Sequence, residues 1–164
     1  MIKDSGNRTE FATGAVRDIQ EGKGRCDLLP LDVVAELLAS PGSGYSVAVI
    51  DGIRKFMSLG YSIFLKEALR SFVIENKWDY PTMLLELSKH FEEGAKKYGE
   101  YNWQKGIPIS RYIDSAIRHY LKWLRGDTDE AHDRAFCWNI VCAIWTCKHK
   151  PDLNDYAKAG ESGD

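Results

Sequence analysis

The stretch FCWNIVCAIW, residues 136–145, decides the fold class of this chain. Every residue in it except Asn139 is apolar. A helix that is apolar on nearly all sides is buried by other helices, because it has no face that favours water. We therefore expect this stretch to form the central helix of a mostly α bundle. The helix is expected to open at Asp127 or Thr128, which follow the helix-ending Gly126.

Helical spacing of apolar residues also precedes this stretch. Apolar side chains recur at intervals of three and four over residues 63–76, 81–98 and 110–125. A glycine directly follows each of the last two segments and is well placed to end a helix. Ser110 is expected to cap the third segment. The chain is thus predicted to contain at least four helices.

The N-terminal half shows weaker patterns. Residues 31–38 have the spacing of a short helix, whereas residues 46–50 fit either a strand or the start of a helix, and the sequence does not decide between them. Residues 1–30 form an arm rich in glycine and basic side chains, without helical or strand periodicity. We expect one all-α domain over residues 1–150 and a flexible tail over residues 151–164.

The composition restricts the class of function. The 164 residues carry 22 Lys and Arg against 24 Asp and Glu, a formal net charge of −2, so no polymeric nucleic acid is expected as a partner. No apolar run reaches the roughly 18 residues of a membrane span, and the first ten residues are polar, so no membrane is expected either. The four cysteines form no CxxC pair. These features indicate a reduced, cytoplasmic protein.

Four carboxylates lie beside the apolar lines of the predicted helices: Glu92, Asp114, Glu130 and Asp133. Three helices that each present a carboxylate to one cleft can hold a hard divalent cation such as Mg²⁺, which prefers oxygen ligands. A second interpretation stays open. Glu92 with Lys96, and Asp114 with Arg118, have the i,i+4 spacing of ordinary ion pairs, and acids in a first helical turn suit the helix dipole.

Five motif strings follow one another along the chain. They are F-x-T-G-A-x-R-D from Phe11, G-K-G-R-x-D-L-L-P from Gly22, H-F-E-x-G-A-x-K-Y-G-x-x-N-W from His90, S-R-Y-x-D-S-A-x-R-H from Ser110, and D-E-x-H from Asp129 followed by Trp138-Asn139. Together they resemble the dATP/dGTP diphosphohydrolase family found largely in bacteriophages, whose members look like MazG-type all-α nucleoside triphosphate pyrophosphohydrolases. The resemblance extends over about residues 5–145.

This resemblance implies hydrolysis of a purine deoxynucleoside triphosphate, dGTP or dATP, to the monophosphate and pyrophosphate, with Mg²⁺ or Mn²⁺ as cofactor. The catalytic residues that it implies are Glu92, Lys97, Arg118, His119 and Glu130. The substrate-binding residues are Arg17, Lys23, Arg25, Asn102, Trp103 and Arg111. The metal ligands are Glu92, Asp114, Glu130 and Asp133. A homo-oligomer, dimer or tetramer, is implied too, in the host cytoplasm if the gene belongs to a phage.

The loop residues Asn102 and Trp103 suit recognition of the base. An amide can bond to a purine edge, and an indole can stack on its face. A buried, anchoring role for Trp103 stays open as the alternative.

Two features depart from the family pattern. Residues 41–80 look like an insertion, which we expect to form a lid or an oligomer interface on a core that is complete without it. Glu92 is followed three residues later by Ala95 instead of a second acid, so Glu93 or His90 is expected to complete the first acidic motif. These departures keep a second function in view, that of a protein that sequesters a nucleotide without cleaving it.

Overall fold

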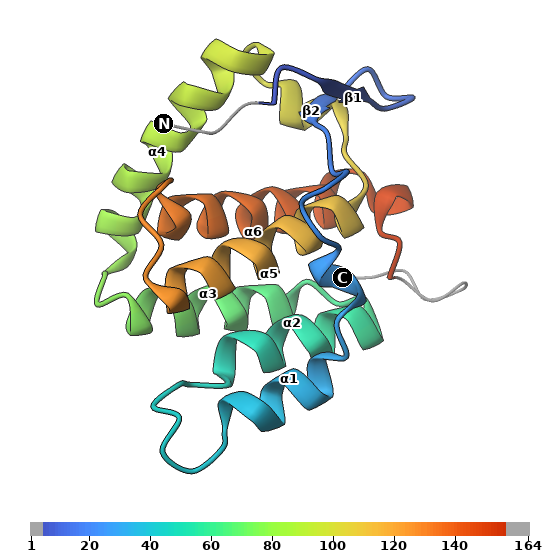
Figure 1. Ribbon diagram of the computed structural model, residues 1–164. Helices are drawn as coiled ribbons and strands as arrows, with labels where there is room; N and C mark the ends of the chain where they lie inside the picture. The colour runs from blue at the N-terminus through green and yellow to red at the C-terminus, as the bar shows by residue number, and fades with distance from the viewer. Residues whose placement is uncertain (1–4, 157–164) are drawn as a thin grey trace.

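A computed structural model describes residues 5–156 of the protein (Figure 1). The described part is mostly helical, with one two-stranded hairpin, so the predicted all-α bundle is confirmed. The helices are α1 (Leu31–Leu38), α2 (Ala48–Leu59), α3 (Ile63–Glu75), α4 (Tyr80–Tyr98), α5 (Ile109–Arg125) and α6 (His132–His149), and the strands are β1 (Arg8–Glu10) and β2 (Val16–Asp18). No helix among the described residues is long and apolar enough to cross a bilayer.

Helices α5 and α6 pack side by side and form the centre of the bundle (Figure 1). Phe136, Ile140 and Ala143 of α6 are fully buried, as the apolar stretch predicts. They face Ile113 and Ile117 of α5, which are buried in the same core. The apolar face of α5 and the nearly all-apolar α6 thus form the centre of the core against which other helices pack.

The beginnings of α5 and α6 differ from the prediction. Helix α6 starts at His132 rather than at Asp127 or Thr128, so Glu130 lies in the loop before the helix. Gly126 ends α5 with a positive φ of 85°, a backbone conformation that favours glycine, and the chain needs several residues to reverse direction. Ser110 does not cap α5, because its hydroxyl bonds to the carboxylate of Asp155.

Residues 41–80, expected to be dispensable for the core, form α2 and α3 and pack into it. The Phe72 ring of α3 lies 4.4 Å from Phe136, 4.9 Å from Trp123 and 6.1 Å from Tyr120, measured between ring centroids. Phe72 is fully buried by these contacts. The expectation of a core that is complete without this segment is therefore wrong, because α3 covers the face that α5 and α6 share.

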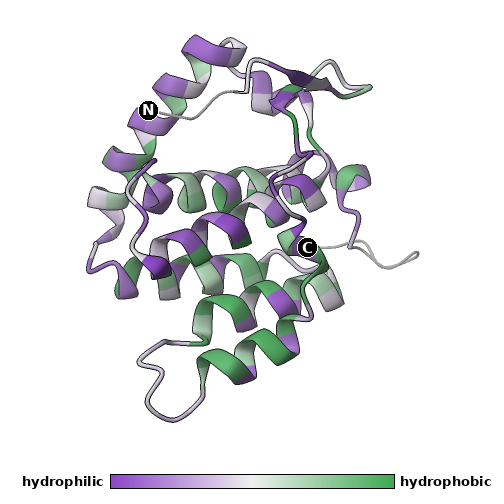
Figure 2. Cartoon of the chain, viewed as in Figure 1, coloured by the Kyte–Doolittle hydropathy of each residue, from purple (hydrophilic) through white to green (hydrophobic). Residues whose placement is uncertain are grey.

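The ambiguous residues 46–50 belong to the start of α2. Helices α2 and α3 approach closely at Gly52, where an added Cβ would lie 2.9 Å from the Cβ of Ala68. A side chain at this position would separate the two helices. Figure 2 colours α1 and α2 largely hydrophobic and α4 largely hydrophilic. Helix α2 buries much of this apolar surface, whereas α1 buries only Leu31 and leaves Val33 and Leu37 exposed.

Helix α4 starts at an Asp79 cap, whose carboxylate accepts a hydrogen bond from the Thr82 N–H at 2.7 Å. Its buried residues are Met83, Leu87 and His90. The buried face therefore runs through positions i, i+4 and i+7 from Met83, which places Glu93 one turn beyond His90 on the same side.

The N-terminal arm is folded against the helices. Its first part is the hairpin of β1 and β2, whose strands of three residues are too short to show a periodic pattern. The segment that follows β2 is held by α5, as described below. In the predicted tail, Asn154 is buried and donates a hydrogen bond to the Gly60 carbonyl, and the Tyr156 ring packs 5.6 Å from Phe56. Residues 157–164 lie outside the described residues.

Candidate functional site

One large cavity, of about 1000 Å³, collects most of the predicted site residues. Its walls come from β2 and the loop after it, the C-terminal half of α4, the 3-10 turn Asn102–Lys105, α5, and the start of α6. Of the predicted residues, those that line it are Arg17, Lys23, Glu92, Asn102, Trp103, Arg111, Asp114, Arg118, His119 and Glu130. The three that do not are Arg25, Lys97 and Asp133.

Arg17 is the cation most deeply enclosed in the wall. Its Nη2 donates a hydrogen bond to Asn139 Oδ1 at 2.6 Å, and its guanidinium lies 5.1 Å from the Tyr112 ring and 5.6 Å from the Trp138 ring. Its Nη1 is shielded from solvent and has no hydrogen-bond partner within residues 5–156. Burial lowers the pKa of Arg17. A buried cation with an unused donor is suited to an anionic ligand, which would supply the missing acceptor.

Arg111 and Lys23 are two more of the basic residues that line the same cavity. Arg111 packs over the Phe11 ring at 5.5 Å, and burial lowers its pKa. Lys23 forms an ion pair with Asp18 of β2. With Arg17, Arg118 and Lys122, these side chains make five basic residues at the cavity wall, among six acidic ones.

Asp114 anchors the glycine-rich loop instead of offering its oxygens to a metal. Its Oδ2 accepts a hydrogen bond from Gln20 Nε2 at 2.7 Å and pairs with Arg118, and its Oδ1 accepts one from the Cys26 N–H at 2.7 Å. Burial alone would raise the pKa of Asp114, but the hydrogen bonds from Gln20 and Arg118 outweigh it and lower the pKa. The prediction of Asp114 as a metal ligand is not supported, because both of its oxygens are occupied.

Arg118 acts together with Asp114. Its Nη2 donates to the Gly24 carbonyl at 2.8 Å and its Nε to the Lys23 carbonyl at 3.1 Å. Asp114 and Arg118 together thus hold the glycine-rich loop against α5. Arg118 is placed to position the loop, which differs from the predicted catalytic role.

Glu92 and Glu93 face different directions on α4. Glu92 is exposed at the rim of the cavity and pairs with Lys96 at 2.5 Å, which lowers the pKa of Glu92. Glu93 is half-buried, lines the cavity, and lies 3.8 Å from Arg134. The solvated ion pair that the sequence left open is therefore what Glu92 forms, and Glu93 is the acid that the helix directs to the cavity.

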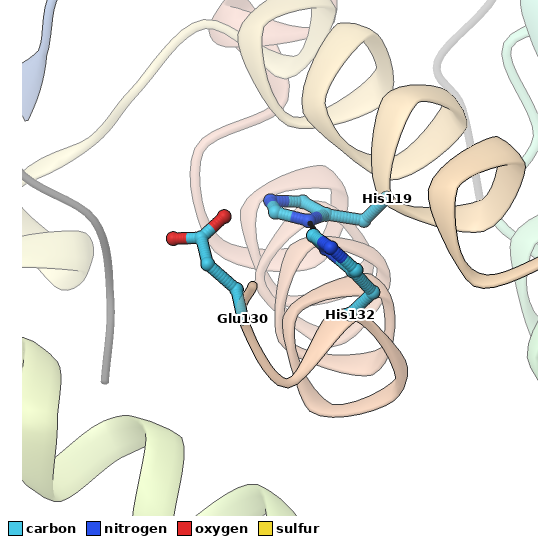
Figure 3. Close-up of side chains that lie close together, drawn as sticks. All are labelled: His119, Glu130 and His132. Carbon is cyan, nitrogen blue, oxygen red and sulfur yellow. Dashed lines mark hydrogen bonds between the residues drawn. The ribbon is translucent and has the colours of Figure 1, made fainter. Parts of the chain in front are cut away.

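His119 and His132 form a hydrogen-bonded pair beside Glu130 (Figure 3). Their Nδ1 atoms lie 2.9 Å apart, and His132 Nε2 lies 2.7 Å from Asp129 Oδ1. His119 comes from α5 and His132 from the first turn of α6. Burial, followed by the neighbouring His132, lowers the pKa of His119 well below its ordinary value. The loop between α5 and α6 thus places two carboxylates beside one half-buried and one buried imidazole.

Asn102 and Trp103 hold the framework of the cavity. The Asn102 amide accepts a hydrogen bond from the Val16 N–H at 2.9 Å and donates one to the Val16 carbonyl at 2.8 Å. Both ends of the amide are used to dock β2, so the predicted reading of a purine edge by Asn102 is not supported. The Trp103 ring lies 5.0 Å from Trp145 and 5.5 Å from Phe91, and it also lines the cavity.

The predicted residues outside the cavity have other partners. Arg25 forms a two-pronged ion pair with Asp27, at 2.7 and 2.5 Å. The Lys97 ammonium lies 5.5 Å from the Tyr98 ring. Asp133 Oδ1 accepts a hydrogen bond from the Arg134 N–H at 2.7 Å.

Comparison with known proteins decides the family. The family model of the dATP/dGTP diphosphohydrolase N-terminal domain matches residues 71–156, more than half of the chain. The chain belongs to this family. No curated protein and no solved structure matches it.

In this member of the dATP/dGTP diphosphohydrolase N-terminal family, the matched residues include α4, α5 and α6 in full. They therefore contain the histidine pair, Glu93 and Glu130. Arg17 and Lys23 precede the matched residues, and reach the cavity through the hairpin and its following loop.

Sequence reasoning assigned no firm role to several residues in this family member's cavity wall or directly behind it. Glu93 was expected, as an alternative to His90, only to complete the acidic motif of Glu92, and the direction of the buried face of α4 is what favours it. Asp129 and His132 were part of a recognised motif string, and their three-residue spacing was the available signal. Asn139, the partner of Arg17, was the one polar residue in the apolar stretch.

Proposed function

We propose that this protein hydrolyses a purine deoxynucleoside triphosphate, dGTP or dATP, in the cavity, releasing the monophosphate and pyrophosphate. The observation that carries the proposal is Arg17, whose buried Nη1 has no hydrogen-bond partner among the described residues and lies at a cavity that Lys23 and Arg111 also line. Such a site suits a polyanion of the size of a nucleotide. The name of the family to which the chain belongs describes this chemistry.

In the proposed complex, the phosphates bind to Arg17, Arg111 and Lys23. Guanidinium groups bind phosphate oxygens through paired hydrogen bonds and favour negative charge as it develops during phosphoryl transfer. The Trp103 ring at the cavity wall offers an apolar surface to the base. Water attacks the α-phosphorus, and the bond to the β-phosphate oxygen breaks.

A divalent cation, Mg²⁺ or Mn²⁺, is proposed to accompany the triphosphate. When bound, it neutralises phosphate charge and polarises the bond that breaks. The carboxylate of Glu93 at the cavity wall fits such a cation, because Mg²⁺ and Mn²⁺ prefer oxygen ligands.

Incubation with each common ribo- and deoxynucleoside triphosphate, with and without Mg²⁺ or Mn²⁺, tests the proposal when the products are identified by mass. The expected result is metal-dependent release of dGMP or dAMP with one pyrophosphate per nucleotide. Retention of intact nucleotide in a one-to-one complex would instead support the sequestering function considered above.

An Arg17→Gln variant links the activity to the cavity. Losing a charge-assisted hydrogen bond to phosphate costs about 1.5–3 kcal/mol, so kcat/KM is expected to fall at least tenfold. Arg54→Gln is the matched control, because Arg54 pairs with Asp51 on α2 and does not line the cavity. Equal activity of Arg17→Gln and the wild type would contradict the assignment of the phosphate site.

We also expect the protein to assemble as a dimer or tetramer. Leu84 and Leu85 on α4 are exposed, which supports a helix-mediated interface. Light scattering after gel filtration measures the mass of the assembly directly.

A further inference from the structure

The histidine pair beside Glu130 has the composition of a metal site that uses nitrogen as well as oxygen. Among the described residues, one ligand atom each from His119, Glu130 and His132 lie within 4.8 Å of one another. The two Nδ1 atoms are 2.9 Å apart. Two nitrogens that each lie about 2.0–2.1 Å from a shared ion are separated by roughly 3–3.5 Å. The pair is therefore already close to the spacing of two ligands on one ion.

Asp129 supplies a second and independent feature of such sites. A histidine that binds a metal through one ring nitrogen usually donates its other N–H to a carboxylate, which fixes the ring and makes it a better ligand. His132 has this arrangement, with Nε2 2.7 Å from Asp129 Oδ1 and Nδ1 directed to His119. His132 is almost completely buried, so its orientation is fixed by packing as well.

We propose that His119, Glu130 and His132 bind one divalent transition-metal ion of the class that prefers imidazole, such as Zn²⁺, with Asp129 positioning His132. Imidazole ligands favour ions of this class over Mg²⁺, which prefers oxygen ligands only. Three protein ligands leave the ion with an open position, as in catalytic rather than structural zinc sites. Because His119 and Glu130 both line the cavity, this open position is accessible from the cavity.

The hydrogen bond between the rings holds the two Nδ1 atoms close together. The contacts are satisfied when His132 donates its Nε2–H to Asp129 and His119 donates its Nδ1–H to His132 Nδ1. For both Nδ1 atoms to bind one ion, His119 would have to carry its proton on Nε2 instead. The two rings would also have to turn, so that both Nδ1 lone pairs meet at the ion.

A neighbouring group of possible ligands, Asp127, Asp129 and His132, is less suitable. Both oxygens of Asp127 accept hydrogen bonds from Arg125, at 2.7 and 2.5 Å. Asp129 in turn lies 3.5 Å from Lys122. Cations thus already neutralise this group, whereas Glu130 lies on the cavity side of the loop.

The inference deepens the proposed function, because an ion at this wall faces the same cavity as Arg17. Any role of the ion in hydrolysis rests on the proposed function. Binding of the ion does not rest on it, because the protein's own side chains define the site.

The test uses full-length protein without a histidine tag, stripped of metal and equilibrated with micromolar Zn²⁺ in millimolar Mg²⁺. Mass spectrometry of the metals is expected to find one Zn²⁺ per chain, with binding at least a hundredfold tighter than that of Mg²⁺. The unfolding midpoint should rise with the Zn²⁺ concentration, because the ion binds the folded state. Wild-type protein that retains no stoichiometric Zn²⁺ overturns the proposal without need of any variant.

Variants then identify the ligands. His119→Gln and Glu130→Gln are each expected to weaken Zn²⁺ binding at least a hundredfold, and Asp129→Asn by about 10–100-fold, as for other outer-shell partners. His149→Gln controls for the loss of a histidine elsewhere, since His149 stacks on Trp145 at the exposed end of α6. Asp127→Asn should bind normally. Tight binding in both His119→Gln and Glu130→Gln, or its loss in Asp127→Asn alone, contradicts the ligand set.

The two proposals fail in different ways. Hydrolysis without retained Zn²⁺ rejects the ion site and leaves the proposed function in place. Zn²⁺ binding without hydrolysis of any nucleotide rejects the function and leaves the ion site in place.

Discussion

Two ion pairs with the same sequence spacing have opposite roles in this molecule. Glu92 with Lys96 on α4 and Asp114 with Arg118 on α5 are both i,i+4 pairs. The side chains of the first pair are 66% and 72% exposed, and those of the second are 2% and 14% exposed. Water screens the first pair, which therefore contributes little to stability. The second pair is enclosed, and further hydrogen bonds from the N-terminal loop complete it.

The difference lies in what surrounds each helix. The outer face of α4 faces solvent, so Glu92 finds only its neighbour one turn away. The corresponding face of α5 is covered by the loop after β2, which brings Gln20 and the Cys26 N–H to Asp114. The i,i+4 spacing therefore predicts that an ion pair forms. Only the fold shows whether that ion pair also holds another segment of the chain in place.

The largest effect is expected from breaking the enclosed pair. Asp114→Asn keeps the size of the side chain and removes its charge, which leaves Arg118 enclosed without its counter-ion. Loss of one partner of a buried pair typically costs about 3–5 kcal/mol. Urea unfolding at neutral pH should show a loss in this range, and proteolysis should become faster within residues 20–26. A loss below about 1 kcal/mol would show that the two pairs are equivalent.

A second test uses the pH dependence of stability to compare the buried side of α4, which carries His90, with its exposed side. Burial, followed by the charge of Arg134, lowers the pKa of His90 from 6.5 to about 4. The unfolded chain thus binds a proton at His90 below about pH 6.5, whereas the folded protein does so only below about pH 4. The contribution of His90 to the free energy of unfolding therefore falls by about 3 kcal/mol as the pH drops from 6.5 to 4. It does not change further at lower pH.

The measurement is the unfolding free energy of wild type and His90→Gln across this range of pH. The difference between the two proteins should vary with pH as described, because Gln does not titrate. His149→Gln, which removes an exposed histidine, should follow the wild-type curve. Parallel curves for wild type and His90→Gln would contradict the assignment.

The smallest effect on stability is expected at Glu92. Glu92→Gln removes the exposed pair with Lys96, and its unfolding midpoint in urea should be indistinguishable from that of the wild type. Glu93→Gln is the informative partner, because Glu93 is half-buried in the cavity wall, whereas Glu92 lies exposed at the rim. Nucleotide hydrolysis should fall at least tenfold in Glu93→Gln and remain unchanged in Glu92→Gln. The reverse result would restore the assignment made from the sequence.

Much of the helical frame was predictable, because it depends on apolar spacing. The stretch over residues 136–145 identified the central helix, and the glycines that follow α4 and α5 marked their ends. Helix α2 was ambiguous, since a short β-branched run at residues 46–50 fits two kinds of structure. The hairpin was not predicted for a related reason. Its strands of three residues are too short to show the alternation of apolar and polar side chains that indicates a strand.

The site was predictable by region more than by residue. The motif strings did bring Arg17, Arg111, His119 and Glu130 to one cavity. They could not distinguish Glu92 from Glu93, because adjacent helical residues differ by about 100° in direction and exposed Leu84 made the apolar line misleading. They also could not show that other side chains already occupy Asp114 and Asn102.

The clamp on the glycine-rich loop has a consequence for the order in which the protein folds. Asp114 and Arg118 hold groups that lie 88 to 95 residues earlier in the chain. During synthesis, the loop leaves the ribosome long before α5 exists to receive it. Contacts over such separations form slowly, because a long loop must close first. The cavity is therefore completed after translation of α5, and a nascent chain that stops short of this helix has its first thirty residues without these anchors.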